Sequence, residues 1–230
     1  MKPIRSLFRP LAVLFICLGG AGSLSASTIF WGSLFGDTLL TSSGTALDSS
    51  FTFELGNFIN GFVPTAGNTA SWALNWQVFD TAVNTDGWTP ADQEIAHSVD
   101  HTLASGSTSP TSTPSAIFTE GAPAYLWAFN SKDVNTMPEW ALLADNDHGT
   151  NVLNAWEFPD PTLQSGESFD WQTRDLDTAI FGGVNDLQGP GLHTASPATF
   201  TLQTHVVPEP SSALLLALAG GSLMRARRRT

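Results

Sequence analysis

Short runs of alternating apolar and polar residues, separated by Gly, Pro, Asn and Asp, fill the centre of this 230-residue chain. Such alternation predicts β-strands that bury one face, and no long stretch has the spacing of a helix. The clearest runs are 51–55 (FTFEL), 71–80 (SWALNWQVFD) and 198–206 (ATFTLQTHV). In the second run the alternation places four apolar side chains on one face, namely Trp72, Leu74, Trp76 and Val78.

Two nearly continuous apolar runs lie further along, at 124–130 and 139–145, and a polar link joins them. Their spacing predicts a β-hairpin. We expect further strands at 28–35 and 179–184. Many short strands with turn residues between them predict an all-β fold, specifically an antiparallel β-sandwich of jelly-roll-like arrangement.

The segment 90–103 is ambiguous. Thr89 followed by Pro90 is typical of a helix start, so we favour a short helix or a loop. Alternation of Ile95, His97, Val99 and His101 allows a strand instead. A helix would bring Glu94, His97 and His101 to one face, where they could hold zinc. The small-residue run at 105–114 predicts a mobile surface loop.

The N-terminus has the order of a secretory signal peptide. Lys2, Arg5 and Arg9 precede an apolar core at 11–18, and small residues follow as far as Ser27. We therefore assign 1–27 to a signal peptide that signal peptidase removes. The single cysteine, Cys17, lies within it, so the remaining chain has no disulfide and depends on a packed core.

The C-terminus, 207–230, has three parts in a fixed order: a short Pro-Glu-Pro element, an apolar run at 213–224 and a basic end. The element consists of Pro208, Glu209 and Pro210, and the basic end of Arg225, Arg227, Arg228 and Arg229. Prolines keep the element extended, and arginines hold the far end on the cytoplasmic side of a membrane. As a helix, the apolar run reaches roughly 21 Å against a hydrocarbon core of about 30 Å. This length predicts transient membrane insertion, and the alternative is an anchor that is never cut.

These three parts together resemble the sorting signal of PEP-CTERM proteins, which Gram-negative bacteria that make exopolysaccharide export. The resemblance implies that an exosortase-type membrane enzyme recognises Pro208, Glu209 and Pro210 and removes the tail. Residues 28–206 form the cargo domain. Its sequence FTFELGNFINGFVPTAGNTASWALNWQVFDTA, with AYLWAF and EWALLA, is similar to verrucomicrobial PEP-CTERM cargo, a similarity that implies no activity.

Charge restricts the partners of this domain. Residues 28–207 carry 20 acidic residues against 2 basic ones, a net charge of −18. Such a surface repels phosphate backbones and anionic lipids, which excludes nucleic-acid binding. Neutral polysaccharide and divalent cations remain as partners.

Two groups of residues are candidate binding sites. All 8 tryptophans lie in the cargo domain. Trp88 and Trp171 have polar neighbours in the sequence, so we expect exposed rings that form a platform for sugar; the alternative is that the indoles fill the core. Asp145 and Asp147, shortly before a glycine, offer oxygen ligands for calcium, and the alternative is an acidic turn.

Motifs of catalysis are missing from the sequence. There is no G-x-S-x-G, no P-loop and no G-x-G-x-x-G, and we predict no enzyme and no required cofactor. The sequence thus predicts an exported, non-catalytic protein of the cell surface or extracellular matrix. One alternative is a carbohydrate-binding module of the exopolysaccharide matrix, and another is a secreted polysaccharide hydrolase, whose paired carboxylates the many acids could supply.

Overall fold

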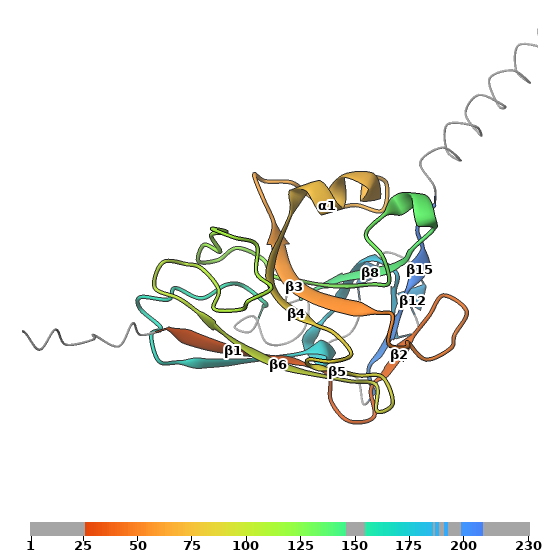
Figure 1. Ribbon diagram of the computed structural model, residues 1–230, viewed down its shortest axis with the longest axis horizontal. Coiled ribbons are helices and arrows are strands. Elements are labelled where there is room, and N and C mark those ends of the chain that lie inside the picture. The colour runs from red at the N-terminus through yellow and green to blue at the C-terminus, as the bar shows by residue number, and fades with distance from the viewer. Residues whose placement is uncertain (1–25, 146–154, 186, 189–190, 193–198, 209–230) are drawn as a thin grey trace, which may run out of the picture.

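The structure, a computed structural model, describes residues 26–145, 155–185, 187–188, 191–192 and 199–208. These parts of the chain are mostly β and form three sheets (Figure 1). Within the same ranges, no helix has the length and apolar character that a membrane span requires.

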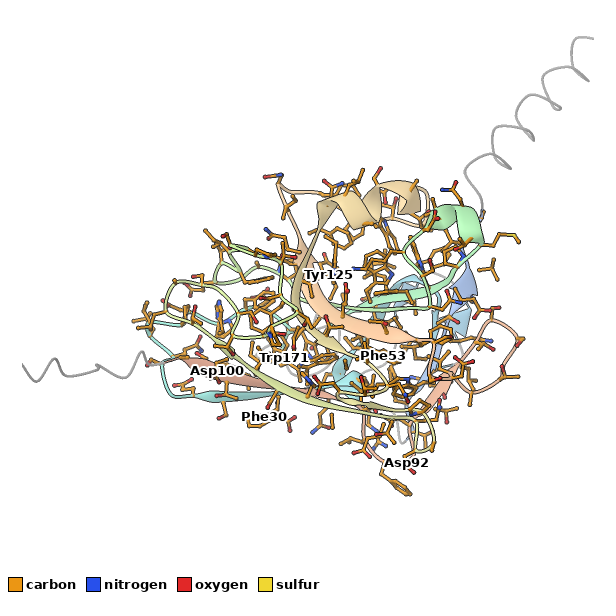
Figure 2. All side chains as sticks on the ribbon, in the orientation of Figure 1. Phe30, Phe53, Asp92, Asp100, Tyr125 and Trp171 are labelled. Carbon is orange, nitrogen blue, oxygen red and sulfur yellow. The ribbon has the colours of Figure 1, made fainter. Side chains whose placement is uncertain are left out.

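The first sheet contains the N-terminal strand. Its order is β5 (Trp88–Thr89), β6 (Glu94–His101), β1 (Ser27–Gly32) and β9 (Ser168–Gln172). Strand β1 is antiparallel to β6 and parallel to β9. Ile29 and Trp31 of β1 point inward and are buried, whereas Phe30 lies on the outside (Figure 2). The strand predicted at 28–35 is therefore present but ends earlier, at Gly32.

The second sheet is the largest. Its order is β13 (Gly191–Leu192), β10 (Thr178–Phe181), β8 (Glu139–Ala144), β7 (Tyr125–Phe129), β3 (Thr52–Phe58) and β4 (Trp76–Ala82), and β15 (His205–Val206) also pairs with β8. The predicted hairpin is confirmed, because β7 and β8 are antiparallel neighbours with Phe129 opposite Trp140. The strand predicted at 51–55 is also confirmed, with Phe51, Phe53 and Leu55 buried.

The third sheet brings the two ends of the domain together. Its order is β12 (Leu187–Gln188), β11 (Gly183–Val184), β14 (Thr201–Gln203) and β2 (Thr38–Leu40). Strands β2 and β14 are parallel. The expectation of a purely antiparallel fold is therefore wrong for two strand pairs, β1–β9 and β2–β14.

The largest sheet is buried on both faces. One face packs on the main core, and the other carries a second, tryptophan-rich cluster beneath the short helix α1 (Trp72–Asn75) (Figure 1). Alternate residues of β7 and β8 supply the two clusters: Leu126, Ala128, Ala141 and Leu143 face the main core, and Trp127, Phe129, Trp140 and Leu142 face the second cluster. Two buried faces explain why these strands are nearly continuous apolar runs.

The strand predicted at 71–80 is wrong in its first half. Residues Thr69–Ser71 form a 3₁₀ turn, α1 follows, and β4 begins only at Trp76. Trp72 turns its ring onto Trp140, with the ring centroids 5.5 Å apart, while Leu74 is 84% exposed. Burial of Trp72 in the second cluster therefore outweighs the local alternation.

The helix favoured at 90–103 is wrong, and the alternative strand is confirmed as β6. Pro90 and Gln93 lie in the turn that joins β5 to β6, and the Gln93 side chain donates to the Pro90 carbonyl at 2.7 Å. Along β6, His97 and His101 point to the inner face and Glu94 to the other. The three side chains cannot share a metal ion, so the zinc site is wrong.

Residues near the C-terminal end of the domain follow the prediction only in part. Phe200 and Leu202 are buried as the alternation predicts, but Val206 is 45% exposed and Val207 is buried. The alternation of buried and exposed side chains shifts by one residue here, because the chain leaves the third sheet after β14 and pairs with β8 through β15. The strand predicted at 179–184 is similarly divided into β10 and β11 by Gly182, which has a φ of 84°.

The run at 105–114 is a loop, as predicted, and it is held against β4. The Ser107 hydroxyl donates to the Phe79 carbonyl at 2.6 Å. Farther along, the Thr113 backbone N–H donates to the Val78 carbonyl at 2.9 Å.

Candidate functional site

The tryptophans are core residues. The eight indoles are Trp31, Trp72, Trp76, Trp88, Trp127, Trp140, Trp156 and Trp171, and each is at most 7% exposed. Trp88 packs edge-on against Phe53, and Trp171 stacks on Trp156 with centroids 5.4 Å apart. The predicted sugar platform of exposed Trp88 and Trp171 rings is therefore wrong. Trp171 alternates with Ser168 and Asp170 along β9, and that phase indicates an inward ring.

The predicted calcium ligands are only partly described. Asp145 directly follows β8 and is 8% exposed, whereas Asp147 lies outside the described residues. Within the part of the chain that the structure describes, no group of three His, Cys, Asp or Glu side chains is arranged to hold a metal ion. Calcium binding at Asp145 and Asp147 stays a prediction.

The start of the Pro-Glu-Pro element is described. Val207 is fully buried, and its backbone N–H donates to the Pro138 carbonyl at 2.8 Å. The next residue, Pro208, is exposed. Glu209, Pro210 and the four arginines of the tail lie outside the described residues.

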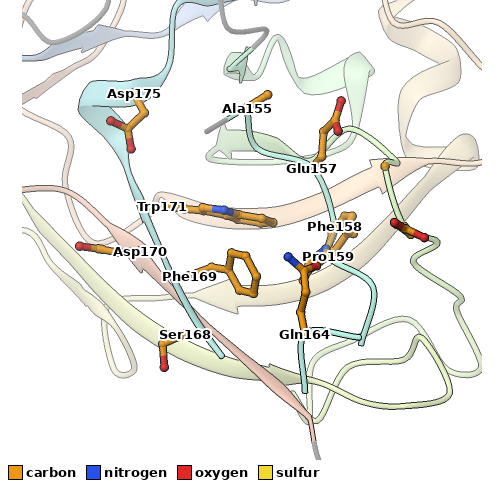
Figure 3. Close-up of a pocket in the computed structure, with 12 residues that line it drawn as sticks. Ala155, Glu157, Phe158, Pro159, Gln164, Ser168, Phe169, Asp170, Trp171 and Asp175 are labelled. Carbon is orange, nitrogen blue, oxygen red and sulfur yellow. The ribbon is translucent and has the colours of Figure 1, made fainter. Parts of the chain in front are cut away.

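A cleft of about 490 Å³ opens beside β9, within the size range of about 300–1,000 Å³ that small-molecule sites occupy (Figure 3). Strand β9 forms one wall, with Ser168, Phe169, Asp170 and Trp171. Residues 155–159 form the facing wall, and Glu120, Gly121, Gln164 and Asp175 complete the lining.

Backbone hydrogen bonds fix the facing wall. The Trp156 carbonyl accepts from the Ala124 backbone N–H at 2.7 Å, and the Phe158 backbone N–H donates to the Ala122 carbonyl at 3.0 Å. Beneath the cleft, the Trp156 and Trp171 rings stack, and Phe158 meets Trp171 edge-on at 5.7 Å between centroids. Both walls are therefore anchored in the main core and hold the cleft open on a rigid base.

The cleft is strongly acidic. Its lining contains four carboxylates, those of Glu120, Glu157, Asp170 and Asp175, and no lysine, arginine or histidine. Burial raises the pKa of Asp175 above its usual range, although the Gln172 N–H that donates to its carboxylate at 3.0 Å acts in the opposite direction. The other three carboxylates are exposed to water. At neutral pH the cleft therefore attracts cations.

Sequence reasoning missed this cleft because it forms only when the facing wall pairs with residues 122–124 and β9 pairs with β1, although most of its lining lies within 155–175. Glu120, Glu157 and Asp170 have no common spacing or motif. The available signal is the polar phase of β9, in which Ser168 and Asp170 alternate with Phe169 and Trp171.

A second polar group links β1, β4 and β6. The fully buried Asp80 carboxylate accepts from Trp31 Nε1 at 2.8 Å and lies 2.5 Å from His97 Nδ1. His97 Nε2 lies 3.4 Å from Asp86, whose side chain is 70% exposed. The hydrogen bond to Asp80 raises the pKa of His97, against the opposing effect of burial. This group joins two sheets through one buried charge.

Comparison of the chain with known protein families, curated proteins and solved structures finds no match.

Proposed function

We propose that this chain is an exported, non-catalytic protein of the cell surface or the extracellular matrix. Signal peptidase cuts near Ser27, where β1 begins, and an exosortase-type membrane enzyme cuts beside Pro208, Glu209 and Pro210. Until that cut, the apolar run at 213–224 holds the chain in the membrane transiently, with Arg225 to Arg229 on the cytoplasmic side.

The observation that carries this proposal is the position of the domain end. Up to Pro208, where the description of the chain ends, the last strand is β15, Val207 is fully buried after it, and Pro208 is exposed. A membrane enzyme would thus reach Pro208, the first residue of the Pro-Glu-Pro element, without having to unfold β15. A cut at this place would also leave Val207 and its bond to Pro138 in the released domain.

The cargo, residues 28–206, is in this proposal one jelly-roll-like β-sandwich. Support comes from the main core, to which the sheet of β1 contributes Ile29 and the largest sheet contributes Phe53. The two parallel strand pairs are departures from the simplest form of that architecture. With its indoles buried, the domain offers no tryptophan platform, so we place the structural role ahead of carbohydrate binding.

The experiment is mass spectrometry of the C-terminal peptide of the protein recovered from its host, with and without the sorting enzyme. We expect a chain that ends beside Pro208–Pro210 when the enzyme is present and one that keeps Arg229 when it is absent. Glu209→Gln should slow processing, whereas the matched change Glu157→Gln should not. A chain that still ends in its arginines while the enzyme is active would refute the proposal and favour a permanent anchor.

A further inference from the structure

Among the residues that the structure describes, strand β9 is an edge of its sheet, because the order β5-β6-β1-β9 ends there. The Glu167 carbonyl accepts from Thr28 N–H of β1 at 2.9 Å. In a parallel pair the backbone groups of alternate residues point to the same neighbour. Those of Ser168 and Asp170 therefore point away from β1, toward the cleft.

In the facing wall, residues 155–159, the backbone groups also point alternately to opposite sides. Trp156 and Phe158 direct their backbone groups to residues 122–124, so the intervening residue Glu157 directs its carbonyl to the other side. Figure 3 shows the cleft between this wall and β9. The cleft is thus bordered by backbone groups able to form hydrogen bonds on both sides, as in a sheet from which a strand is missing.

Charge and shape define the occupant. Glu120 and Glu157 line the cleft, and Asp170 adds a third carboxylate on the outer face of β9, where it accepts from the Gln172 side-chain amide at 2.9 Å (Figure 3). The described residues contain no group that converges on a single metal ion. An extended chain that carries several positive charges fits such a distribution of carboxylates better than a single metal ion does. The indoles are buried, which removes the flat ring faces on which a sugar stacks, while the partly buried Phe169 ring and Pro159 offer apolar surface to short side chains.

We propose that the free edge of β9 binds an extended basic peptide of a partner protein by strand addition. The peptide backbone pairs with Ser168 and Asp170, and its lysine or arginine side chains lie against Glu157, Asp170 and Glu120. This interaction is independent of how the C-terminal tail is processed.

The first test uses synthetic peptides on the purified protein. The probe is an acetylated and amidated peptide of alternating Thr and Lys, and its matched control has Glu in place of each Lys. Fluorescence of the stacked Trp156 and Trp171 beneath the cleft, checked by calorimetry, measures binding. We expect saturable binding of the Lys peptide only. Two further Lys peptides are N-methylated at every second residue, one at its Thr positions and the other at its Lys positions. At least one of them should bind at least tenfold more weakly than the unmethylated peptide, because methylation removes backbone donors.

The second test changes the protein. Asp170→Asn and Glu157→Gln each remove one exposed charge of the cleft and should weaken binding of the Lys peptide several-fold. Asp92→Asn, an equally exposed change in the turn between β5 and β6, should leave binding unchanged.

Three results would overturn the proposal. Absence of saturable binding of the Lys peptide would do so directly. If both methylated peptides bound as tightly as the unmethylated Lys peptide, the interaction would be charge attraction without strand addition. Equally tight binding of a glucosamine tetramer would identify the cleft as a site for cationic polysaccharide.

Discussion

Replacement of His97 by alanine tests how the protein tolerates a buried charge. Asp80 is fully buried, and His97 and the Trp31 indole are its hydrogen-bond partners. In His97→Ala the carboxylate keeps only the indole N–H, while its second oxygen already has no partner in the described part of the chain. Loss of the imidazole therefore leaves a charge in the core with a single donor.

The magnitude follows from the burial of the pair. Removing one partner of a fully buried ion pair costs about 3–5 kcal/mol, and a hydrogen bond to a charged group contributes about 1.5–3 kcal/mol. Because the His97 side chain is 18% exposed, we expect less than the full cost of breaking a buried ion pair, about 2–3 kcal/mol. For a domain of this size that corresponds to a fall in the melting temperature of roughly 4–12 °C.

Urea unfolding followed by tryptophan fluorescence measures this change in the free energy of unfolding. The matched control is Asp86→Asn, which removes the exposed outer partner of the same ring and should alter the free energy by less than about 0.5 kcal/mol. If His97→Ala were as stable as the unchanged protein, or if the two variants lost equal stability, Asp80 would not depend on His97 and the reasoning would be refuted.

Two more predictions follow from the structure. Asp80 raises the pKa of His97, so the contribution of this pair to stability is complete below the unfolded-state pKa of about 6.5 and is lost as pH rises through the folded-state pKa. The difference in the free energy of unfolding between the unchanged protein and His97→Ala should therefore shrink in urea titrations as pH rises above about 6.5, and a constant difference would contradict this prediction. In the short helix α1, Trp72→Ala should cost about 3–5 kcal/mol because the ring is fully buried, while Leu74→Ala two residues away should cost less than about 0.5 kcal/mol. Equal losses for the two α1 variants in thermal unfolding would support the alternating strand instead.

Strand positions could be predicted wherever the spacing of apolar residues matches the burial of one or both faces of the strand. The runs of β7 and β8 were recognisable because each is apolar, short and followed by turn residues. That both faces of their sheet are buried could be inferred only loosely, since a continuous apolar run is also compatible with a buried helix.

The errors have a common physical origin in tertiary contacts. Trp72 and Leu74 share a phase in the sequence, yet the ring of Trp72 enters a cluster of aromatic residues supplied by distant strands. Helix-start chemistry at Thr89 and Pro90 serves a turn instead, because β6 gains its partners from β1. Local signals identify what a segment can form, and pairing with residues far along the chain decides which form it takes.

The cleft was beyond sequence reasoning for the same reason. Its acidity could be anticipated from the net charge of the domain, but its location depends on β9 being an edge among the described strands and on a facing wall that residues 122–124 hold in place. The exposure of Trp88 and Trp171 was misjudged because polar neighbours in a strand say little about the direction of the next side chain.

The two parallel strand pairs determine when the domain can fold. Strand β1 pairs with β9, and β2 pairs with β14, so the first two strands of the domain depend on partners that are synthesised long after them. Because loops this long close slowly, the edge of β1 that faces β9, as well as β2, stays unpaired until most of the domain is available, although β1 can pair earlier with β6. Folding is thereby postponed until synthesis of the domain is almost complete. A domain that ends before β14 would leave β2 as an unpaired strand prone to aggregation.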